Sequence, residues 1–246
     1  MKRVMLVVAY DGTGYHGWQA QPGHTTIEGV LNEKLSALLQ EEITVIGASR
    51  TDAGVHSYGN VAVFDTNTRI PAEKLSYALN QRLPGDIVVQ RSCEVAPDFH
   101  PRHCESRKTY EYRIWNSTFP MPARRLDTFF YHRPLDLEAM QRAAELLVGE
   151  YDFKSFCAAG TAVKTTVRRI YSLSVEQQKE LITIRVCGNG FLYNMVRILA
   201  GTLIQVGSGE RRPEELADIL AAKDRSAAGP TAPAHGLTMI GIKFSS

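Results

Sequence analysis

Apolar residues along the chain fall into short continuous runs and into stripes with helical spacing. Met5 to Tyr10 is an apolar run of strand length. From Thr25 to Leu39 the apolar positions recur three and four residues apart, which is the spacing of a helix with one buried face. Thr25 followed by Glu28 is the residue pair of a capping box, so the helix is expected to begin there. The stripe consists of Ile27, Val30, Leu31, Leu35, Leu38 and Leu39.

The same patterns predict alternating elements in the rest of the chain. Many connections between the expected strands are too short for right-handed crossovers, which favours an α+β fold with mixed or antiparallel sheets. Two prolines and a basic pair interrupt the periodicity at residues 120–125 and predict a linker. We therefore expect an N-terminal half, residues 1–119, and a C-terminal half, residues 120–246, that share a cleft. Further strands are expected at 43–48, 60–65, 86–95, 108–115, 167–176, 181–187 and 238–244, and helices at 71–81, 137–148, 191–206 and 213–222.

Charge is informative in its distribution and not in its sum. The chain has 28 basic and 26 acidic residues, so its formal net charge of +2 proves no nucleic-acid partner. Residues 153–175, however, include Lys154, Lys164, Arg168 and Arg169 and no acidic residue, and a second basic cluster lies in residues 102–125. Local excess of this kind is what phosphate contacts require. A set of solvated faces is the alternative interpretation.

The cysteines and histidines do not have the spacing of a metal site. The four cysteines are far apart and include no C-x-x-C pair, and His100, His103 and Cys104 have no second ligand pair at finger-like spacing. We expect buried thiols in a reducing compartment and no metal. The apolar run at the N-terminus is too short for a signal peptide, and no run approaches the length of a bilayer span. The expected location is cytoplasmic, without a membrane partner.

The segment Gly12–Gly17 matches the G-x-G-x-x-G pattern of dinucleotide-binding turns. In such a turn the helix starts within the glycines, whereas here it is delayed until Thr25, and no acidic residue follows at the expected spacing. A nicotinamide or flavin cofactor is therefore not expected. Tyr15, His16 and Trp18 in this loop could stack on unpaired bases, or the loop could be purely structural.

Candidate chemistry lies in the segment Ala48–His56. Asp52 follows an apolar strand, Gly54 allows the backbone to reverse, and Arg50 supplies a positive charge two residues from the carboxylate. An opposite charge at that distance keeps a partly desolvated carboxylate ionised, and such a carboxylate is a competent nucleophile. The plain alternative is an Asx turn in which Arg50 pairs with Asp52 at the surface.

The segment Arg50–His56, with the sequence RTDAGVH, resembles the central motif of the TruA-type tRNA pseudouridine synthases. Four more blocks match that family in kind and in order, so the resemblance spans nearly the whole chain. One departure is Ser57-Tyr58, which stands where members more often carry a small residue. The four further blocks are residues 10–19, 107–114, 190–197 and 231–237.

The resemblance implies two ferredoxin-like (RRM-like) halves whose sheets join around a central cleft. It also implies that no cofactor is used, that uridines at positions 38, 39 and 40 of the tRNA anticodon arm are the substrate, and that two subunits form a homodimer. Asp52 would be the nucleophile, Tyr110 would border the target uracil, and Arg50 would hold the flipped nucleotide or fill its vacated place. Arg197 would pair with Asp52 across the cleft.

The residues themselves support part of these assignments. Tyr110 shares one strand face with Tyr112 and Ile114, so it could equally be a core residue. Arg197 lies on a largely apolar helix, where an unpaired guanidinium is costly, so a carboxylate partner is expected. Two other classes of protein compete with the synthase. A non-catalytic RNA-binding protein would not need Asp52, and a nucleotide-dependent oxidoreductase would need the helix and the acidic residue that the glycine-rich loop lacks.

Overall fold

The structure, a computed structural model, describes residues 1–160 and 163–245. The chain divides into two units, of which the first consists of Met1–Glu105 and the residues from Met239 onwards, and the second is Ser106–Thr238. This division differs from the expected boundary between residues 119 and 120. Strand β5 (Ser106–Asn116) pairs with β9 (Leu181–Gly188) and so belongs to the second unit, while the last strand returns to the first.

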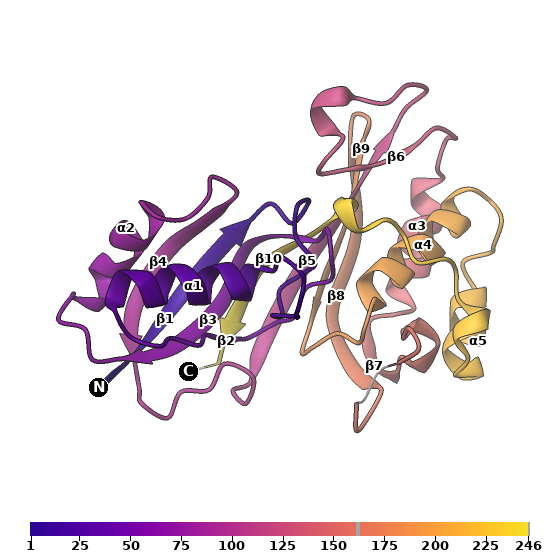
Figure 1. Cartoon of the computed structure of the whole chain (residues 1–246). Coiled ribbons are helices and arrows are strands. Elements are labelled where there is room, and N and C mark those ends of the chain that lie inside the picture. The colour runs from indigo at the N-terminus through magenta and orange to yellow at the C-terminus, as the bar shows by residue number, and fades with distance from the viewer. Residues whose placement is uncertain (161–162, 246) are drawn as a thin grey trace. The chain divides into compact units, whose positions relative to one another are not determined.

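The first unit has the element order β-α-β-β-α-β, followed by the C-terminal strand. Its central strand β1 is antiparallel to both β3 and β4, and the sheet order is β4-β1-β3-β10, with β2 paired to β3. Helices α1 and α2 lie along this sheet (Figure 1). The elements are β1 (Lys2–Tyr10), α1 (Ile27–Leu39), β2 (Ile46–Gly47), β3 (His56–Thr66), α2 (Leu75–Asn80, preceded by a 3-10 turn at Ala72–Lys74), β4 (Ile87–Val95) and β10 (Leu237–Phe244).

The core of the first unit lies between one face of the sheet and the two helices. Every second residue of β1 is buried, as the period of a strand with one covered face requires. The expected stripe on α1 is confirmed, because Ile27, Leu31 and Leu35 are fully buried and the other members pack against them.

Only two of the six residues expected as a strand at 43–48 form one. The backbone amide of Ile43 donates to the Ser36 hydroxyl at 2.9 Å, and that of Val45 donates to Asn32 Oδ1 at 2.8 Å. These amides therefore bind side chains of α1 where a longer strand would have used a neighbouring strand. The segment is buried as expected, but regular pairing is limited to β2.

The start of α1 differs from the expected capping box by one residue. The hydroxyl of Thr26, which is 2% exposed, accepts from the amide of Gly29 at 3.2 Å, so Thr26 is the N-cap. The Glu28 carboxylate accepts from the amide of Ala20 at 2.7 Å, outside the helix. Glu28 thus ties the preceding loop to the first helical turn.

We expect Thr26→Ala to lower the free energy of unfolding by about 1 kcal/mol, because it removes the only side-chain acceptor at this helix start in the described structure. Urea denaturation measures the change. Thr25→Ala is the matched control, since Thr25 is exposed and does not cap the helix. A larger loss for Thr25→Ala than for Thr26→Ala would restore the capping box expected from the sequence.

The second unit has the sheet order β5-β9-β8-β7, antiparallel throughout, with β6 added parallel to β5. Helices α3 and α4 lie on one face of this sheet (Figure 1). Strands β6 and β7 are not among the elements expected from the sequence, and the expected linker contains a 3-10 turn at Pro122–Arg124. The remaining elements are β6 (Phe129–Tyr131), α3 (Leu137–Glu145), β7 (Gly149–Asp152), β8 (Val167–Gln178), α4 (Met195–Gly207) and α5 (Glu215–Ala222), with 3-10 turns at Lys154–Phe156, Arg225–Ala227 and Ala234–Gly236.

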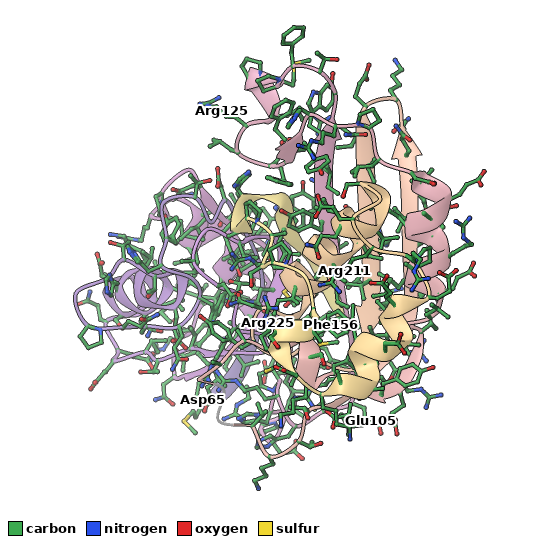
Figure 2. The ribbon with its side chains drawn as sticks, turned by 90° about the vertical axis from the view of Figure 1, so that its right-hand side faces the viewer. Asp65, Glu105, Arg125, Phe156, Arg211 and Arg225 are labelled. Atoms are coloured by element: carbon green, nitrogen blue, oxygen red, sulfur yellow. The ribbon has the colours of Figure 1, made fainter. Side chains whose placement is uncertain are left out.

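The interior of the second unit is apolar, and its connecting segments are held by polar side chains. Phe156 is fully buried, and Arg225 donates to the Ala228 carbonyl and to the Thr231 hydroxyl in the segment between α5 and β10 (Figure 2). The two units together confirm the α+β class with mixed and antiparallel strands. None of the helices in the described ranges is long and apolar enough to cross a membrane.

Candidate active site

Asp52 lies in the turn between β2 and β3, where its residue is partly exposed. Gly54 adopts a φ of +77°, which confirms the expected backbone reversal. The amide of Val55 donates to the Asp52 carbonyl at 3.2 Å and closes the turn. The carboxylate therefore stands just before a long, buried strand, in a backbone that only a glycine at its centre allows without strain.

The loop that follows β1 holds this turn by several hydrogen bonds. The amide of Gly54 donates to the Tyr15 carbonyl at 3.2 Å, and the amide of Trp18 donates to the Thr51 carbonyl at 3.0 Å. The hydroxyls of Tyr10 and Thr51 are 2.8 Å apart. Since these bonds engage the residues on both sides of Asp52, they fix the position from which the carboxylate projects.

Histidine at the end of the motif provides another contact with the same loop. The amide of Gly12 donates to Nδ1 of the buried His56 at 3.1 Å, and an Asp11 oxygen lies 3.1 Å from the same nitrogen. Burial raises the pKa of Asp11, but hydrogen bonds from Thr13 and the proximity of His56 outweigh it, so the pKa lies below its ordinary value. Asp11 is thus an ionised side chain that links the loop to the start of β3.

Two of the three aromatic residues proposed for base stacking in this loop are instead part of the core. Trp18 is fully buried and its indole covers Gly47, where an added Cβ would lie 2.2 Å from Trp18 Nε1. Tyr15 is 8% exposed and donates its hydroxyl to Asp86 at 2.7 Å. The structural interpretation of the loop therefore holds for both residues. His16 is exposed and lies beside His24, with ring centroids 4.2 Å apart.

Arg50 is exposed next to the turn, and no ion pair joins it to a carboxylate among the described residues. The surface pairing of Arg50 with Asp52, the plain alternative, is therefore not present there. Arg102 donates from Nε to the Gly47 carbonyl at 2.7 Å. Burial lowers the pKa of Arg102, and the nearby positive charge of Arg50 lowers it further. Two guanidinium groups are thus close enough to influence each other beside the turn, and the Glu28 carboxylate acts on Arg102 in the opposite direction.

In the second unit, Tyr110 is 6% exposed and meets the ring of Phe191 edge to face, with centroids 5.2 Å apart. The adjacent Tyr112, on the same strand face, is fully buried and donates its hydroxyl to the Pro233 carbonyl at 3.0 Å. Burial raises the pKa of Tyr112, so it stays protonated. Tyr110 is therefore held in a rigid aromatic setting.

Arg197 is fixed in place by contacts within its own unit. Its Nε donates to the Ala232 carbonyl at 2.8 Å, and its Nη1 donates to Asn194 Oδ1 at 2.9 Å. The amide of Ala232 in turn donates to the Arg197 carbonyl at 3.1 Å. Asn194 has a φ of 59° and ends the loop before α4, which explains why the helix begins at Met195 and not at the expected residue 191.

The structure thus assembles two separate parts of the expected site. The turn with Arg50 and Asp52 belongs to the first unit, and Tyr110 and Arg197 belong to the second. Sequence reasoning missed the supporting residues, above all Arg102, Phe191 and Asn194. Phe191 and Asn194 lie in the same sequence block as Arg197, residues 190–197, and the resemblance of that block could have identified them.

The cluster of histidines in the first unit forms no candidate metal centre. His100 and His103 stack on each other with centroids 3.8 Å apart. Burial lowers the pKa of His100, and the charges of His103 and Arg102 lower it further. Across residues 1–160 and 163–245, no group of three or more His, Cys, Asp or Glu side chains is arranged to hold a metal ion.

Comparisons with known proteins relate the sequence of this chain to one family. The family described as tRNA pseudouridine synthase matches residues 6–103 and 143–245. A protein named tRNA pseudouridine synthase A from a Thermoanaerobacter species is 49% identical over 244 residues, covering 99% of this chain and 100% of the relative. Proteins of the same name are 45% identical in Acetivibrio thermocellus, over 99% of this chain and 100% of the relative, and 48% identical in Brevibacillus brevis, over 97% and 98%.

Proposed function

The chain belongs to the tRNA pseudouridine synthase family, and from this premise we propose that it isomerises uridine to pseudouridine in tRNA with Asp52 as the nucleophile. As a member of that family it is an isomerase that acts on tRNA. The observation that carries the assignment of Asp52 is the turn between β2 and β3. There a carboxylate is partly exposed in a backbone held by the loop after β1, with two guanidinium groups close by.

The reaction breaks the bond from the ribose to N1 of uracil and forms a bond from the same ribose carbon to C5. The proton at C5 leaves and N1 gains one, so nothing is oxidised and no external group is added. The protein must therefore supply a nucleophile, hold the detached base and take the uridine out of its stack. A redox cofactor has no part in this balance.

The other site residues have roles that follow from their settings. The rigid pair of Tyr110 and Phe191 suits the face of a flat base, since aromatic rings stack on unpaired bases. The exposed side chain of Arg50 is long enough to hold the flipped nucleotide or to fill its vacated place. Arg197, fixed by two hydrogen bonds, suits a carboxylate partner, and we propose Asp52 as that partner.

Within tRNA we assign the substrate to the anticodon arm, at positions 38, 39 and 40. We further assign the protein to the cytoplasm, as a homodimer that works without a cofactor. These assignments are supported by the family and by the five sequence blocks, of which Arg50–His56 is the central one.

The test is release of tritium from C5 of labelled uridine in tRNA by the purified protein without added cofactor. We expect release, with the label lost only from the anticodon arm. A non-catalytic RNA-binding protein would bind the tRNA and release nothing, and that result would refute the proposed function.

The fork geometry of Arg197 gives a further prediction. We expect Arg197→Lys to lower the turnover rate about tenfold, because a lysine keeps the charge but cannot donate to Ala232 and Asn194 in the same fixed plane. Tritium release at saturating tRNA measures it. Arg211→Lys is the control, since the Arg211 guanidinium donates to Gln205 Oε1 at 2.8 Å and Arg211 has no part in the proposed site. Equal rates for Arg197→Lys and the unmodified protein would show that charge alone suffices.

A further inference from the structure

Two neighbouring arginines on β8 point to opposite faces of the second sheet. Successive side chains of a strand alternate between faces, and Ile170 is buried on the face that the helices cover. Arg168, two residues before it, shares that face and is half-buried. Arg169 is exposed on the other face, where its guanidinium lies 5.8 Å from the ring centroid of Tyr171.

The helix-covered face is also the face that carries Tyr110. Gly188 on β9 pairs with Lys108 on β5 and with Ile170 on β8, so it lies between the two strands. The ring of Phe191 fills the space above Gly188, since a Cβ there would lie 3.1 Å from the ring. Phe191 in turn meets Tyr110. The aromatic pair therefore lies over this face of the sheet, one strand away from β8.

Arg168 borders the loop that presents Phe191. A Cβ at Gly190 would lie 3.8 Å from Arg168 Nε, which places the stem and the Nε of this arginine against the loop backbone. Arg168 and Ile170 are two residues apart, or roughly 7 Å along the strand. The guanidinium is accordingly a close neighbour of the aromatic pair.

Arg168 has no carboxylate partner in the described part of the chain. Its Nη1 donates to the Thr165 carbonyl at 2.9 Å and to the Val167 carbonyl at 2.6 Å. Burial lowers its pKa, and the nearby Cys157 side chain opposes that effect only in part. On the other face, by contrast, both Arg113 and Arg185 pair with Glu111. A half-buried cation that lacks such a partner is the setting in which an anionic ligand gains most.

We propose that Arg168 binds a phosphodiester oxygen of the RNA, at the nucleotide whose base is held by Tyr110 and Phe191 or at its immediate neighbour. Because Nη1 is occupied by two carbonyls, Nε and Nη2 remain with three N–H groups, which match two oxygens of one phosphate. The inference rests on the proposed function, since it presumes that tRNA is the ligand of this face.

The test measures the dissociation constant of the full-length protein for unmodified tRNA at several salt concentrations. We compare Arg168→Ala and Arg168→Lys with Arg169→Ala, which removes the same charge from the opposite face. Arg168→Ala should weaken binding about tenfold and reduce the slope of log Kd against log salt by about one. Arg168→Lys should keep the slope and recover part of the affinity. Arg169→Ala should change both quantities less.

An unchanged salt slope in Arg168→Ala, together with a lowered melting temperature, would overturn the proposal. Arg168 would then serve only the carbonyls of Thr165 and Val167. Equal slope changes in Arg168→Ala and Arg169→Ala would also overturn it, because they would indicate a general charge effect. If Arg168→Ala does not fold, the affinity of Arg168→Lys for tRNA tests the proposal. Lysine lacks the planar pair of Nε and Nη2 donors, so binding must still be weaker than in the unmodified protein. Absence of tritium release by the unmodified protein would refute the proposed function separately.

Discussion

Asp52→Asn is expected to reduce tritium release by at least about four orders of magnitude, to the rate seen without enzyme. Asparagine preserves the size of the side chain and the backbone bonds of the turn, but its amide is not a nucleophile under these conditions. The affinity for tRNA should remain close to normal, because phosphate contacts elsewhere supply most of the binding free energy. Single-turnover assays and a binding titration measure the two quantities on one preparation.

Asp65→Asn provides a matched control for the loss of a carboxylate. Asp65, which is labelled in Figure 2, lies on β3, in the strand that leaves the catalytic turn. It forms a 2.6 Å ion pair with Arg3. The guanidinium of Arg3 lowers the pKa of Asp65, so Asp65 is ionised like a catalytic carboxylate. Its replacement should lower stability and leave turnover unchanged. Retained turnover in Asp52→Asn would remove Asp52 from the role of nucleophile.

Except for β6 and β7, the order of helices and strands was predictable from the sequence because burial imposes a period on each element. The stripe of α1 and the alternation in β1 both follow from one covered face. Two differences within the predicted elements have local causes. Residues 43–48 read as a strand because they are apolar, but their amides bind Asn32 and Ser36 on α1. Thr25 and Thr26 are both threonines, so the residue type does not show which of them is the N-cap of α1. The path of the preceding loop makes it Thr26.

The domain boundary was harder to predict because strand pairing is not local. Prolines at 120 and 122 interrupt the periodicity, so the break appeared to lie there. The boundary depends on β5, which belongs to the second unit because it pairs with β9. That partner lies about seventy positions further along the chain, at residues 181–188. Neither that pairing nor the return of the last strand to the first unit leaves a local signal.

The candidate site shows the same distinction between local and distant information. The turn around Asp52 was predictable because Asp52 and Gly54 are close in sequence and turn chemistry is local. The role of the G-x-G-x-x-G loop in holding this turn was not predictable, since its glycines match a nucleotide-binding pattern equally well. In the structure the backbone of the turn passes directly against Gly12 and Gly17, so only a residue without a Cβ fits at these positions.

Gly12→Ala is therefore expected to have the second-largest effect on activity. A Cβ at this position would lie 2.1 Å from the Val55 carbonyl oxygen and 2.6 Å from its carbon. Both atoms are backbone, so no side-chain rotation relieves the overlap, and the turn that carries Asp52 must move. A displacement of about 1 Å at a catalytic group costs about a hundredfold in rate. Overpacking of this kind also lowers the free energy of unfolding by about 1–3 kcal/mol.

Gly14→Ala is the matched control for this substitution, because a Cβ at Gly14, two residues away in the same loop, has no neighbour within 4 Å. Tritium release at saturating tRNA should be normal in Gly14→Ala and reduced in Gly12→Ala, and urea denaturation should separate their stabilities. A Gly12→Ala protein that is destabilised but turns over normally would mean that the loop stabilises the fold without positioning Asp52. Since Gly12 also donates its amide to His56, loss of both rate and stability is the result that the contact geometry requires.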